Sequence, residues 1–315
     1  MRLRILVSTL VFLSQINLCW HSTGHMLVAE MARIKIAETN PDALVWAENL
    51  ISKFSDFCGE GKHPFTDSAT WADKIKEEDW WSMFNWHFVD RVFLGDEESS
   101  RSQDLKTGDV LNPSDNAVWA INNCISQLKS NHRSNGNTNP ILGKSIALRN
   151  LIHFIGDLHQ PLHGSTRITK DKPHGDQGGN LFKIKRYPEE RGPIWNNLHF
   201  VWDHLFDGFK EVWSPLSDYD YQLINDWSLY LLRMYPYSQI GEKIRKNKDA
   251  KSWSLESFEI VKNFLYKDLE EDQEIPSDYE KVAKDLVKER LVLASYRLSD
   301  TIIDIYNSIS TTALT

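Results

Sequence analysis

The densest group of possible metal ligands lies in one short segment, between His153 and His163. His153 and Asp157 are four residues apart, so on a helix both side chains project from one face and can hold one cation together. Pro161 ends that helix, which lets His163 turn toward a different cation. A buried carboxylate needs a partner. We therefore predict a metal site here; the alternative is a polar cap on a core helix.

The same spacing recurs in His199-Phe-Val-Trp-Asp203. Such a pair alone is weak evidence, because similar pairs are frequent on solvated helix faces. Asp73, in Thr-Trp-Ala-Asp, and His87, in Asn-Trp-His-Phe-Val-Asp, are bracketed by aromatic residues, which indicates burial. Each of them, taken singly, is more often a buried polar residue with an ordinary protein partner. The metal hypothesis therefore depends on all of these ligands meeting in space.

Residues 1–19 have the layout of a secretory signal peptide, with Arg2 and Arg4 before a short apolar run. The alternative is an ordinary buried helix. Cleavage after Cys19 would make Trp20 the first residue, and its α-amine, with a pKa of about 8, could bind metal in its neutral form. We expect a protein without a membrane anchor, either secreted or in the lumen of an endomembrane or acidic compartment.

Charge and cysteine content limit the possible partners. The formal net charge is −8, and loss of the two arginines of the leader makes it −8 − 2 = −10. This balance argues against a basic nucleic-acid groove, so a polyanionic substrate would need bound cations to supply positive field. Cys58 and Cys124 remain after cleavage, and in an oxidising compartment they suggest a disulfide; two isolated buried thiols are the alternative.

Apolar periodicity predicts mostly helices to carry these residues. The stretches with helical patterns are 24–36, 42–54, 67–76, 117–128, 142–158 and 278–309. One short β-hairpin, residues 181–185 with 194–197, is the only sheet expected. No linker divides the chain. We predict a signal peptide at 1–19 followed by one compact, mainly α-helical domain at 20–315.

Six spaced motifs, taken together, closely resemble the S1/P1 family of zinc-dependent nucleases, whose fold is similar to that of zinc-dependent phospholipase C. They are Trp20-x4-His25, Trp71-Ala-Asp73, His87-Phe-Val-Asp90, His153-Phe-Ile-Gly-Asp157 through His163, Gly178-Gly-Asn180 and Asn197-Leu-His199-x3-Asp203. The match keeps their order and spacing. The segment 294–298 looks like the closing helix of the family.

The resemblance implies three Zn²⁺ ions per chain. The first would be held by Asp73, His87, His153 and Asp157; the second by the amine and carbonyl of Trp20, His25 and the shared Asp157; the third by His163, His199 and Asp203. His159 is expected to support or cap these ligands rather than to bind metal.

The resemblance also implies hydrolysis of single-stranded DNA and RNA to 5′-phosphate products, and removal of the phosphate from 3′-mononucleotides, by a monomer. A hydroxide between the two ions that share Asp157 would attack phosphorus, and the third ion would stabilise the departing O3′. Asp73, Asp157 and Lys76 are the implied catalytic residues. Lys76 stands where the family commonly has Arg, and lysine cannot form the bidentate fork. The alternative for Lys76 is a solvated helix lysine.

Four residues are implied to contact the substrate. Phe88 would stack on a base and Asp90 would accept a hydrogen bond from a base amine, with Gln177 and Asn180 nearby. Without the resemblance, Phe88 would be assigned to the core. A duplex does not present an unstacked base cheaply, which favours single strands.

Two alternatives remain from the sequence. One is a zinc-dependent phospholipase C, although His199-x3-Asp203 is nuclease-like at the last metal site. The other is a secreted zinc-binding protein with impaired catalysis, which the departure at Lys76 keeps open.

Overall fold

The computed structural model describes residues 20–78, 81–95, 105–130, 140–185 and 196–313 of the 315-residue chain. The predicted signal peptide lies outside the described residues. The fold is mainly α-helical, as the sequence predicts. Within the described residues, no helix combines the length and apolar character needed to cross a membrane.

The predicted helices are present with small shifts at their ends, except that the stretch 67–76 is divided among α4, η1 and α5. The elements are α1 (Ser22–Thr39), α2 (Pro41–Ser52), α3 (Ser55–Cys58), α4 (Pro64–Asp67), η1 (Ser68–Thr70), α5 (Trp71–Glu77), η2 (Trp81–His87), β1 (Val92–Leu94), α6 (Ala117–Lys129), α7 (Pro140–His159), η3 (Pro161–Gly164), β2 (Thr166–Ile168), α8 (Leu198–Asp203), η6 (Leu205–Asp207), α9 (Asp218–Met234), α10 (Tyr237–Lys246), α11 (Ala250–Ile260), η7 (Val261–Leu265) and α12 (Ser277–Ala313).

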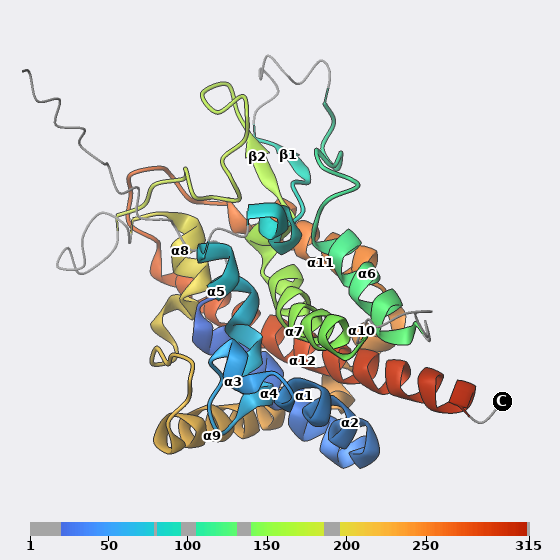
Figure 1. Ribbon diagram of the computed structural model, residues 1–315. Coiled ribbons are helices and arrows are strands. Elements are labelled where there is room, and N and C mark those ends of the chain that lie inside the picture. Colours follow the sequence, from blue (N-terminus) through green and yellow to red (C-terminus); the bar gives the residue numbers. More distant parts are fainter. Residues whose placement is uncertain (1–19, 79–80, 96–104, 131–139, 186–195, 314–315) are drawn as a thin grey trace, which may run out of the picture.

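Helix α7 is the centre of the molecule (Figure 1). It packs against α6, α12, α2, α11, α1 and α5, and the whole stretch from Ala147 to His159 is buried. A helix buried on all sides cannot be amphipathic, which explains the continuous apolar pattern around its polar residues. Pro161 follows its last residue, as expected for a helix stop. Any polar side chain on α7 therefore needs a partner inside the protein.

Side-chain hydrogen bonds set the starts of α2 and α8, and α8 carries two candidate ligands. The Asn40 side chain accepts from Ala43 N at the start of α2, and Asn197 accepts from Phe200 N at the start of α8. Asparagine is a favoured N-cap because its side chain satisfies one of the unpaired N–H groups of the first turn. Asn197 thus fixes the first turn of the helix that carries His199.

The sheet differs from the prediction. In the described part of the chain, the only sheet is parallel, pairing β1 with β2 in the register Val92 to Thr166. Of the predicted hairpin, residues 186–195 lie outside the described residues, and the flanks form one antiparallel bridge, Lys183 with Asn197. Lys185 bridges to Glu274 instead. Ile184 N also donates to the Asn196 carbonyl and Leu198 N to the Phe182 carbonyl, so the local pairing is present in part and Lys185 adds a nonlocal contact.

The predicted disulfide is also wrong. Cys58 and Cys124 are both free and buried. Cys58 ends α3, which packs on α2, whereas Cys124 lies on α6, which packs on α7. Burial raises the pKa of both thiols, that of Cys124 to about 12, so both stay protonated and unreactive. Of the two alternatives, isolated buried thiols is correct.

A buried ion pair ties α7 to the segment after α3. The Arg149 guanidinium donates to both carboxylate oxygens of Glu60, at 2.6 and 2.7 Å, and to the Ile51 carbonyl at 3.0 Å. Both side chains are almost fully buried. Arg149, His153 and Asp157 follow each other at four-residue spacing along α7, so this anchor sets the position of the metal-ligand face.

We predict that Arg149→Met lowers the free energy of unfolding by about 3–5 kcal/mol, because it leaves the Glu60 carboxylate buried without its partner. Urea denaturation followed by circular dichroism measures this change. Lys284→Met, which removes the exposed Glu280–Lys284 pair on α12, is the control and should cost about 0.3–0.5 kcal/mol. Equal effects of the two substitutions would contradict the anchoring role.

Candidate metal centre

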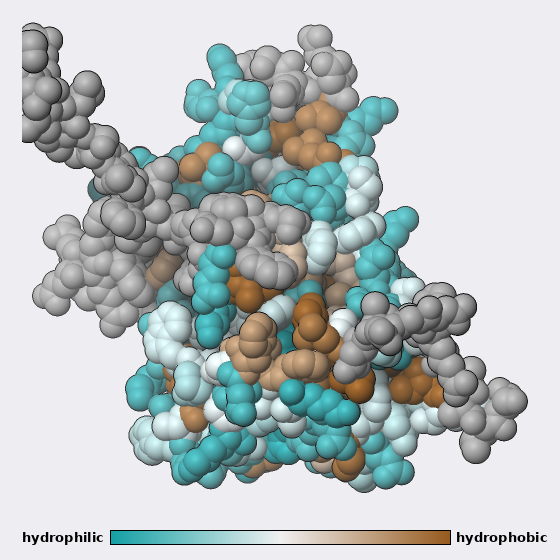
Figure 2. Space-filling model, in the orientation of Figure 1, coloured by the Kyte–Doolittle hydropathy of each residue, from teal (hydrophilic) through white to brown (hydrophobic). Residues whose placement is uncertain are grey.

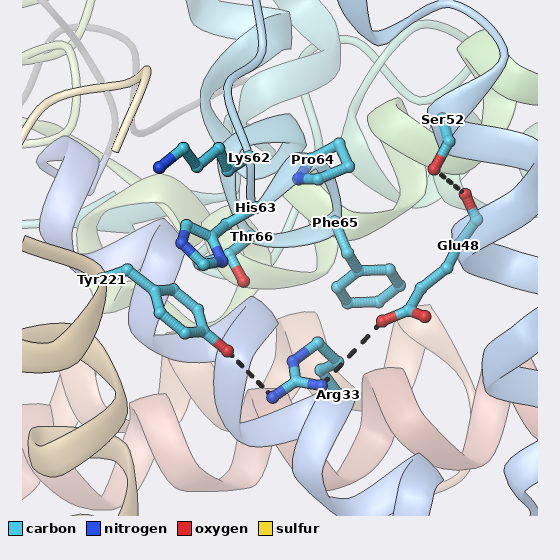
Figure 3. A pocket seen from close by; sticks show the side chains of 9 residues that line it. All are labelled: Arg33, Glu48, Ser52, Lys62, His63, Pro64, Phe65, Thr66 and Tyr221. Atoms are coloured by element: carbon cyan, nitrogen blue, oxygen red, sulfur yellow. Dashed lines mark hydrogen bonds and ion pairs between the residues drawn. The ribbon is translucent and has the colours of Figure 1, made fainter. Parts of the chain in front are cut away.

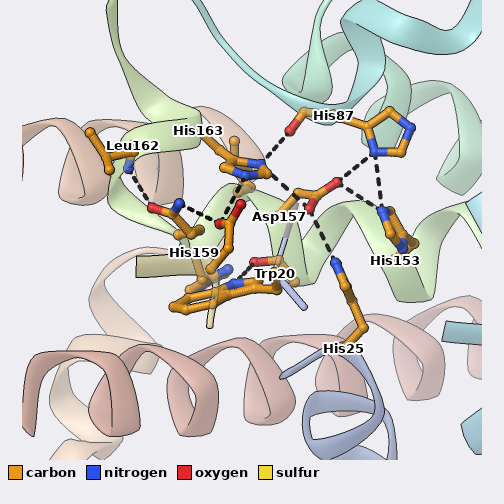
Figure 4. Close-up of polar contacts among 12 residues, drawn as sticks. Trp20, His25, His87, His153, Asp157, His159, Leu162 and His163 are labelled. Atoms are coloured by element: carbon orange, nitrogen blue, oxygen red, sulfur yellow. Dashed lines mark hydrogen bonds and ion pairs between the residues drawn. The ribbon is translucent and has the colours of Figure 1, made fainter. Parts of the chain in front are cut away.

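The carboxylate of Asp157 lies among four histidine side chains (Figure 4). Oδ1 is 3.3 Å from His25 Nε2 and 3.4 Å from His163 Nδ1. Oδ2 is 3.0 Å from His87 Nδ1 and 3.1 Å from His153 Nε2. All five side chains are buried. Oδ2 thus faces His87 and His153, whereas Oδ1 faces His25 and the Nδ1 edge of His163, so one cation at each oxygen would make Asp157 a bridging carboxylate.

Asp73 completes one side of this cluster. Its Oδ1 lies 3.5 Å from both His87 Nδ1 and His153 Nε2. Lys76, one turn further along α5, donates to the same oxygen at 2.8 Å. Lys76 is only 6% exposed, so it is a buried neighbour of the cluster and not a solvated helix lysine.

A third ligand set lies on the other side of His163. Its Nε2 is 3.6 Å from Asp203 Oδ1, and His199 Nε2 is 3.0 Å from Asp203 Oδ2. His199 and Asp203 are four apart on the short helix α8, so they share a face as predicted. The structure therefore brings together the eight ligands other than Trp20 that the sequence predicts.

Backbone carbonyls fix the orientation of three of these rings. His153 Nδ1 donates to the Ala69 carbonyl at 2.6 Å. His199 Nδ1 donates to the Gly178 carbonyl at 2.7 Å, and His163 Nδ1 donates to the His87 carbonyl at 2.9 Å. A proton on Nδ1 leaves the lone pair on Nε2, the usual arrangement of a metal-bound histidine. Each of these rings therefore presents Nε2 to the cluster.

The residues fit zinc. Among the predicted ligands, ligand atoms converge within 4.8 Å of one another in three groups: His25, His153 and Asp157; Asp73, His87 and His153; and His163, His199 and Asp203. Nitrogen and oxygen ligands about 2.0–2.1 Å from a tetrahedral zinc lie about 3.3 Å apart, close to the separations above. Within the described part of the chain, buried atoms such as His25 Nε2 and Asp203 Oδ2 have no hydrogen-bond partner. A cation would satisfy them.

Charge within the cluster opposes the effect of burial. Burial alone would raise the pKa of Asp157, but His153 and His163 hold it well below its usual range. Burial alone would lower the pKa of His153, but the carboxylates of Asp157 and Asp73 raise it to about 10. The carboxylates of Asp157 and Asp73 therefore stabilise either a protonated histidine or a metal cation. Binding of metal would release the histidine protons.

Trp20 is held against the same centre. It is buried, and its indole Nε1 donates to the Gly156 carbonyl at 2.8 Å. A side chain on Gly156 would lie 2.9 Å from His25 Nδ1, so only glycine lets α1 approach α7 this closely. The His25 ring stacks on His153, with centroids 3.8 Å apart. The α-amine of Trp20 exists only after the bond to Cys19 is cleaved.

The four predicted substrate-contacting residues line one cavity of about 270 Å³. Phe88, Asp90, Gln177 and Asn180 share it with the ligand His199. Gln177, Gly178 and Gly179 all have positive φ, and a side chain on Gly178 would lie 2.5 Å from the Leu162 carbonyl. The glycine turn therefore brings Gly178 O to His199 and forms one wall of the cavity.

A second cavity, of about 320 Å³, shares no lining residue with the first (Figure 3). The buried Glu30 carboxylate accepts from three of its lining residues, Arg33, Thr66 and Tyr221. His63 stacks on the Tyr221 ring, with centroids 3.5 Å apart. These polar groups bond to one another, and none of the predicted metal ligands lines this cavity.

Gln160 contacts a candidate metal ligand, a role that the sequence motifs do not predict. Its Nε2 donates to Asp203 Oδ1 at 2.7 Å, and its Oε1 accepts from Leu162 N at 2.6 Å. It caps η3 and orients a ligand from α8 at the same time. Its place between a helix end and Pro161 was the available signal, because such positions favour side-chain caps. His159 Nδ1 donates to the Ile155 carbonyl, and Arg297 donates to its Nε2. Neither bond involves a predicted metal ligand, so the expected support of the ligands by His159 stays a prediction.

The fold and the site define a helical protein with clustered histidine and aspartate metal ligands beside a cavity that contains an aromatic residue. The model of the family described as S1/P1 Nuclease matches residues 20–307, so the chain belongs to the S1/P1 nuclease family. This family is zinc-dependent in general, and membership supports a nuclease function.

Curated proteins with similar sequences are also named as nucleases. The chain is 28% identical to Endonuclease 4 of Arabidopsis thaliana over 302 residues, covering 92% of this chain and 90% of the relative. It is 26% identical to Endonuclease 3 of the same plant, covering 96% and 95%. Nuclease S1 of Aspergillus oryzae is 25% identical, covering 61% of this chain and 55% of the relative. These names support a hydrolase that acts as an endonuclease.

We predict that Gln160→Ala weakens zinc binding at the His163, His199 and Asp203 set by about 10- to 100-fold, because Asp203 loses the donor that orients it. Titration against a competing chelator measures the weakest bound equivalent. Gln222→Ala, on the exposed surface of α9, is the matched control. Unchanged affinity in Gln160→Ala would show that α8 alone positions Asp203.

Proposed function

We propose that this chain is an exported endonuclease with three zinc ions, which hydrolyses single-stranded DNA and RNA to 5′-phosphate products. We further propose that it removes the phosphate of 3′-mononucleotides. The observation that carries this proposal is the position of Asp157 between two pairs of histidines, with a third ligand set next to the cavity lined by Phe88 and Asp90.

The proposed assignment of ligands is the one that the family resemblance implies, with His153, which converges with both His25 and His87, given to the first zinc. Asp157 belongs to two sites, since its two oxygens face different pairs of imidazoles. The first zinc takes Asp73, His87, His153 and Asp157; the second takes the amine and carbonyl of Trp20, His25 and Asp157; the third takes His163, His199 and Asp203. When bound, zinc supplies Lewis acidity and lowers the pKa of coordinated water.

The side chains around the metals would orient the substrate. The Lys76 ammonium lies at the edge of the cluster, held by Asp73 at 2.8 Å, where it can neutralise a phosphate oxygen. Asp73 and Asp157 keep their imidazoles in place and carry the negative charge that attracts the cations. These three side chains are the proposed catalytic residues.

The neighbouring cavity supplies the proposed base contacts. Phe88 packs edge-on against Phe84, with ring centroids 5.4 Å apart, which holds a flat surface for stacking worth about 1–3 kcal/mol per base. Asn180 Nδ2 donates to the Gln177 carbonyl, whereas no described residue donates to Asn180 Oδ1. That oxygen and Asp90 can therefore accept from a base amine. Only an unstacked base can enter, which favours single strands.

The second zinc site requires processing of the chain. We propose that residues 1–19 are a signal peptide, that cleavage after Cys19 creates the amine of Trp20, and that the product is secreted or lumenal. The burial of Trp20, with its indole bonded to the carbonyl of Gly156 next to Asp157 in the chain, supports this. Every proposed ligand comes from one chain, which supports a monomer.

We predict that Asp157→Asn lowers kcat/KM for single-stranded DNA more than Asp203→Asn does. Loss of one electrostatic stabiliser costs about 10²- to 10³-fold, and Asp157 serves two cations whereas Asp203 serves one. A fluorogenic single-stranded substrate measures both, using exported protein whose N-terminal sequence begins at Trp20. Asp226→Asn, exposed on α9, is the control.

The same preparation distinguishes the alternatives. Hydrolysis of phosphatidylcholine without hydrolysis of DNA would indicate a phospholipase. About three zinc ions per chain with neither activity would indicate a zinc-binding protein with impaired catalysis. Equal losses in Asp157→Asn and Asp203→Asn would contradict the bridging role of Asp157.

We also predict a pH-dependent base preference. Burial, with the nearby Asp176, raises the pKa of Asp90 to about 6. The carboxylate is ionised and accepts from a base amine above this pH, and it is protonated below it. The ratio of kcat/KM for adenosine 3′-phosphate over uridine 3′-phosphate should therefore fall about tenfold from pH 7.5 to pH 5, since a charged hydrogen bond contributes about 1.5–3 kcal/mol.

Titration of the metal ligands changes kcat/KM for both nucleotides equally, because both substrates use the same cations. It therefore does not change the ratio of the two values. Asp90→Asn should give a ratio that does not change with pH. A falling ratio in Asp90→Asn as well would assign the effect to another group.

A further inference from the structure

A further set of metal-ligand side chains converges beside the start of α1. His21, His204 and Glu211 bring one ligand atom each to within 4.8 Å of one another. Glu211 Oε1 contacts His21 Nε2, and the two imidazole centroids are 4.7 Å apart. We propose that these three side chains form an additional site for a divalent transition-metal cation of the zinc type, sharing no ligand with the three sites above.

The donor set suits this class of cation. Two imidazoles and one carboxylate are a recognised protein ligand set for zinc, with the fourth position left for water. Acidic clusters attract hard cations such as Ca²⁺, which prefer oxygen ligands, whereas two nitrogen donors favour zinc and its transition-metal neighbours. The residue types therefore select the cation.

The ring of His204 is already held in a suitable orientation. Its Nδ1 donates to the Phe200 carbonyl at 2.9 Å, and its face stacks on the Phe200 ring, with centroids 3.5 Å apart. A proton on Nδ1 places the lone pair on Nε2, as in the three oriented histidines of the main centre. Binding a cation needs no change of tautomer here.

His21 requires one small adjustment. Its Nδ1 accepts from Thr23 N at 3.3 Å, and a cation on Nε2 would move the ring proton to Nδ1 and break this bond. The distance exceeds the usual range for such hydrogen bonds, so little is lost. Trp213 packs edge-on against the ring, with centroids 5.2 Å apart, and limits its rotation. The competing arrangement is a simple hydrogen bond from His21 to Glu211.

The cluster lies where a cation would link the start of α1 to the end of α8. His21 follows Trp20 in sequence and His204 follows Asp203, and His21 N donates to the Asp203 carbonyl at 3.0 Å. A cation bound by both imidazoles and Glu211 would cross-link the first residues of α1 to the end of α8. It would thereby hold the mature N-terminus against the main centre. Glu211 is 38% exposed, which leaves a route for the cation from solvent.

The test compares zinc content in wild-type protein, Glu211→Gln and the control Glu259→Gln, an exposed carboxylate on α11. Each protein is dialysed against the same series of buffered free zinc concentrations, and bound zinc is measured by mass spectrometry. We expect wild type and control to bind one equivalent more than Glu211→Gln. The far-UV circular dichroism spectrum of Glu211→Gln should match that of the wild type, which shows that it is folded.

Anomalous diffraction at the zinc absorption edge locates the cation directly. A peak between His21, His204 and Glu211 in wild-type crystals is expected. Equal zinc content in wild type and Glu211→Gln, or no peak at this position in zinc-saturated crystals, overturns the proposal. Failure of the three-zinc proposal would change the total content but not the difference between the two proteins, so the two failures are distinguishable.

Discussion

The structure depends on one buried negative charge, the carboxylate of Asp157. It has no exposed surface, and the groups that face it come from α1, η2, α7 and η3. Removing a carboxylate from water is costly unless cations or hydrogen bonds replace its hydration. Segments more than 130 residues apart in the chain are therefore held together by the same group that prepares the metal centre. Folding and assembly of the site cannot be separated here.

The pairing of β1 with β2 explains how two of those segments meet. Val89 N donates to the His163 carbonyl at 2.7 Å, and Thr166 N donates to the Arg91 carbonyl at 2.9 Å. These backbone bonds run beside the side-chain bond from His163 Nδ1 to the His87 carbonyl. A sheet of only two short strands would be unstable alone. Its role is to fix the register between the segment of His87 and the segment of His163.

Local spacing predicts the part of the site that local geometry determines. His153 with Asp157, and His199 with Asp203, share a helix face because the helical repeat requires it, and Pro161 ends α7 as its ring chemistry dictates. The parallel strands were not predictable, since their partners lie more than 70 residues apart and each is three residues long. The hydrogen bonds from His153 to the Ala69 carbonyl and from His199 to the Gly178 carbonyl were not predictable for a related reason. Every residue has a carbonyl, and only the fold determines which one contacts a histidine. The disulfide between Cys58 and Cys124 was predicted wrongly, because an even number of cysteines says nothing about the distance between them.

The hydropathy of the surface and the net charge bear on where a polyanion can bind. Hydrophilic residues cover most of the described surface in Figure 2, with hydrophobic patches between them, and the formal net charge of the chain is −8. Nucleic acid would be repelled by such a chain on average, so attraction has to be local. Metal cations at the candidate centre, together with Lys76, would provide it at one place, next to the cavity of Phe88 and Asp90. An acidic protein with a cationic centre therefore favours binding at the site of chemistry over binding elsewhere on its surface.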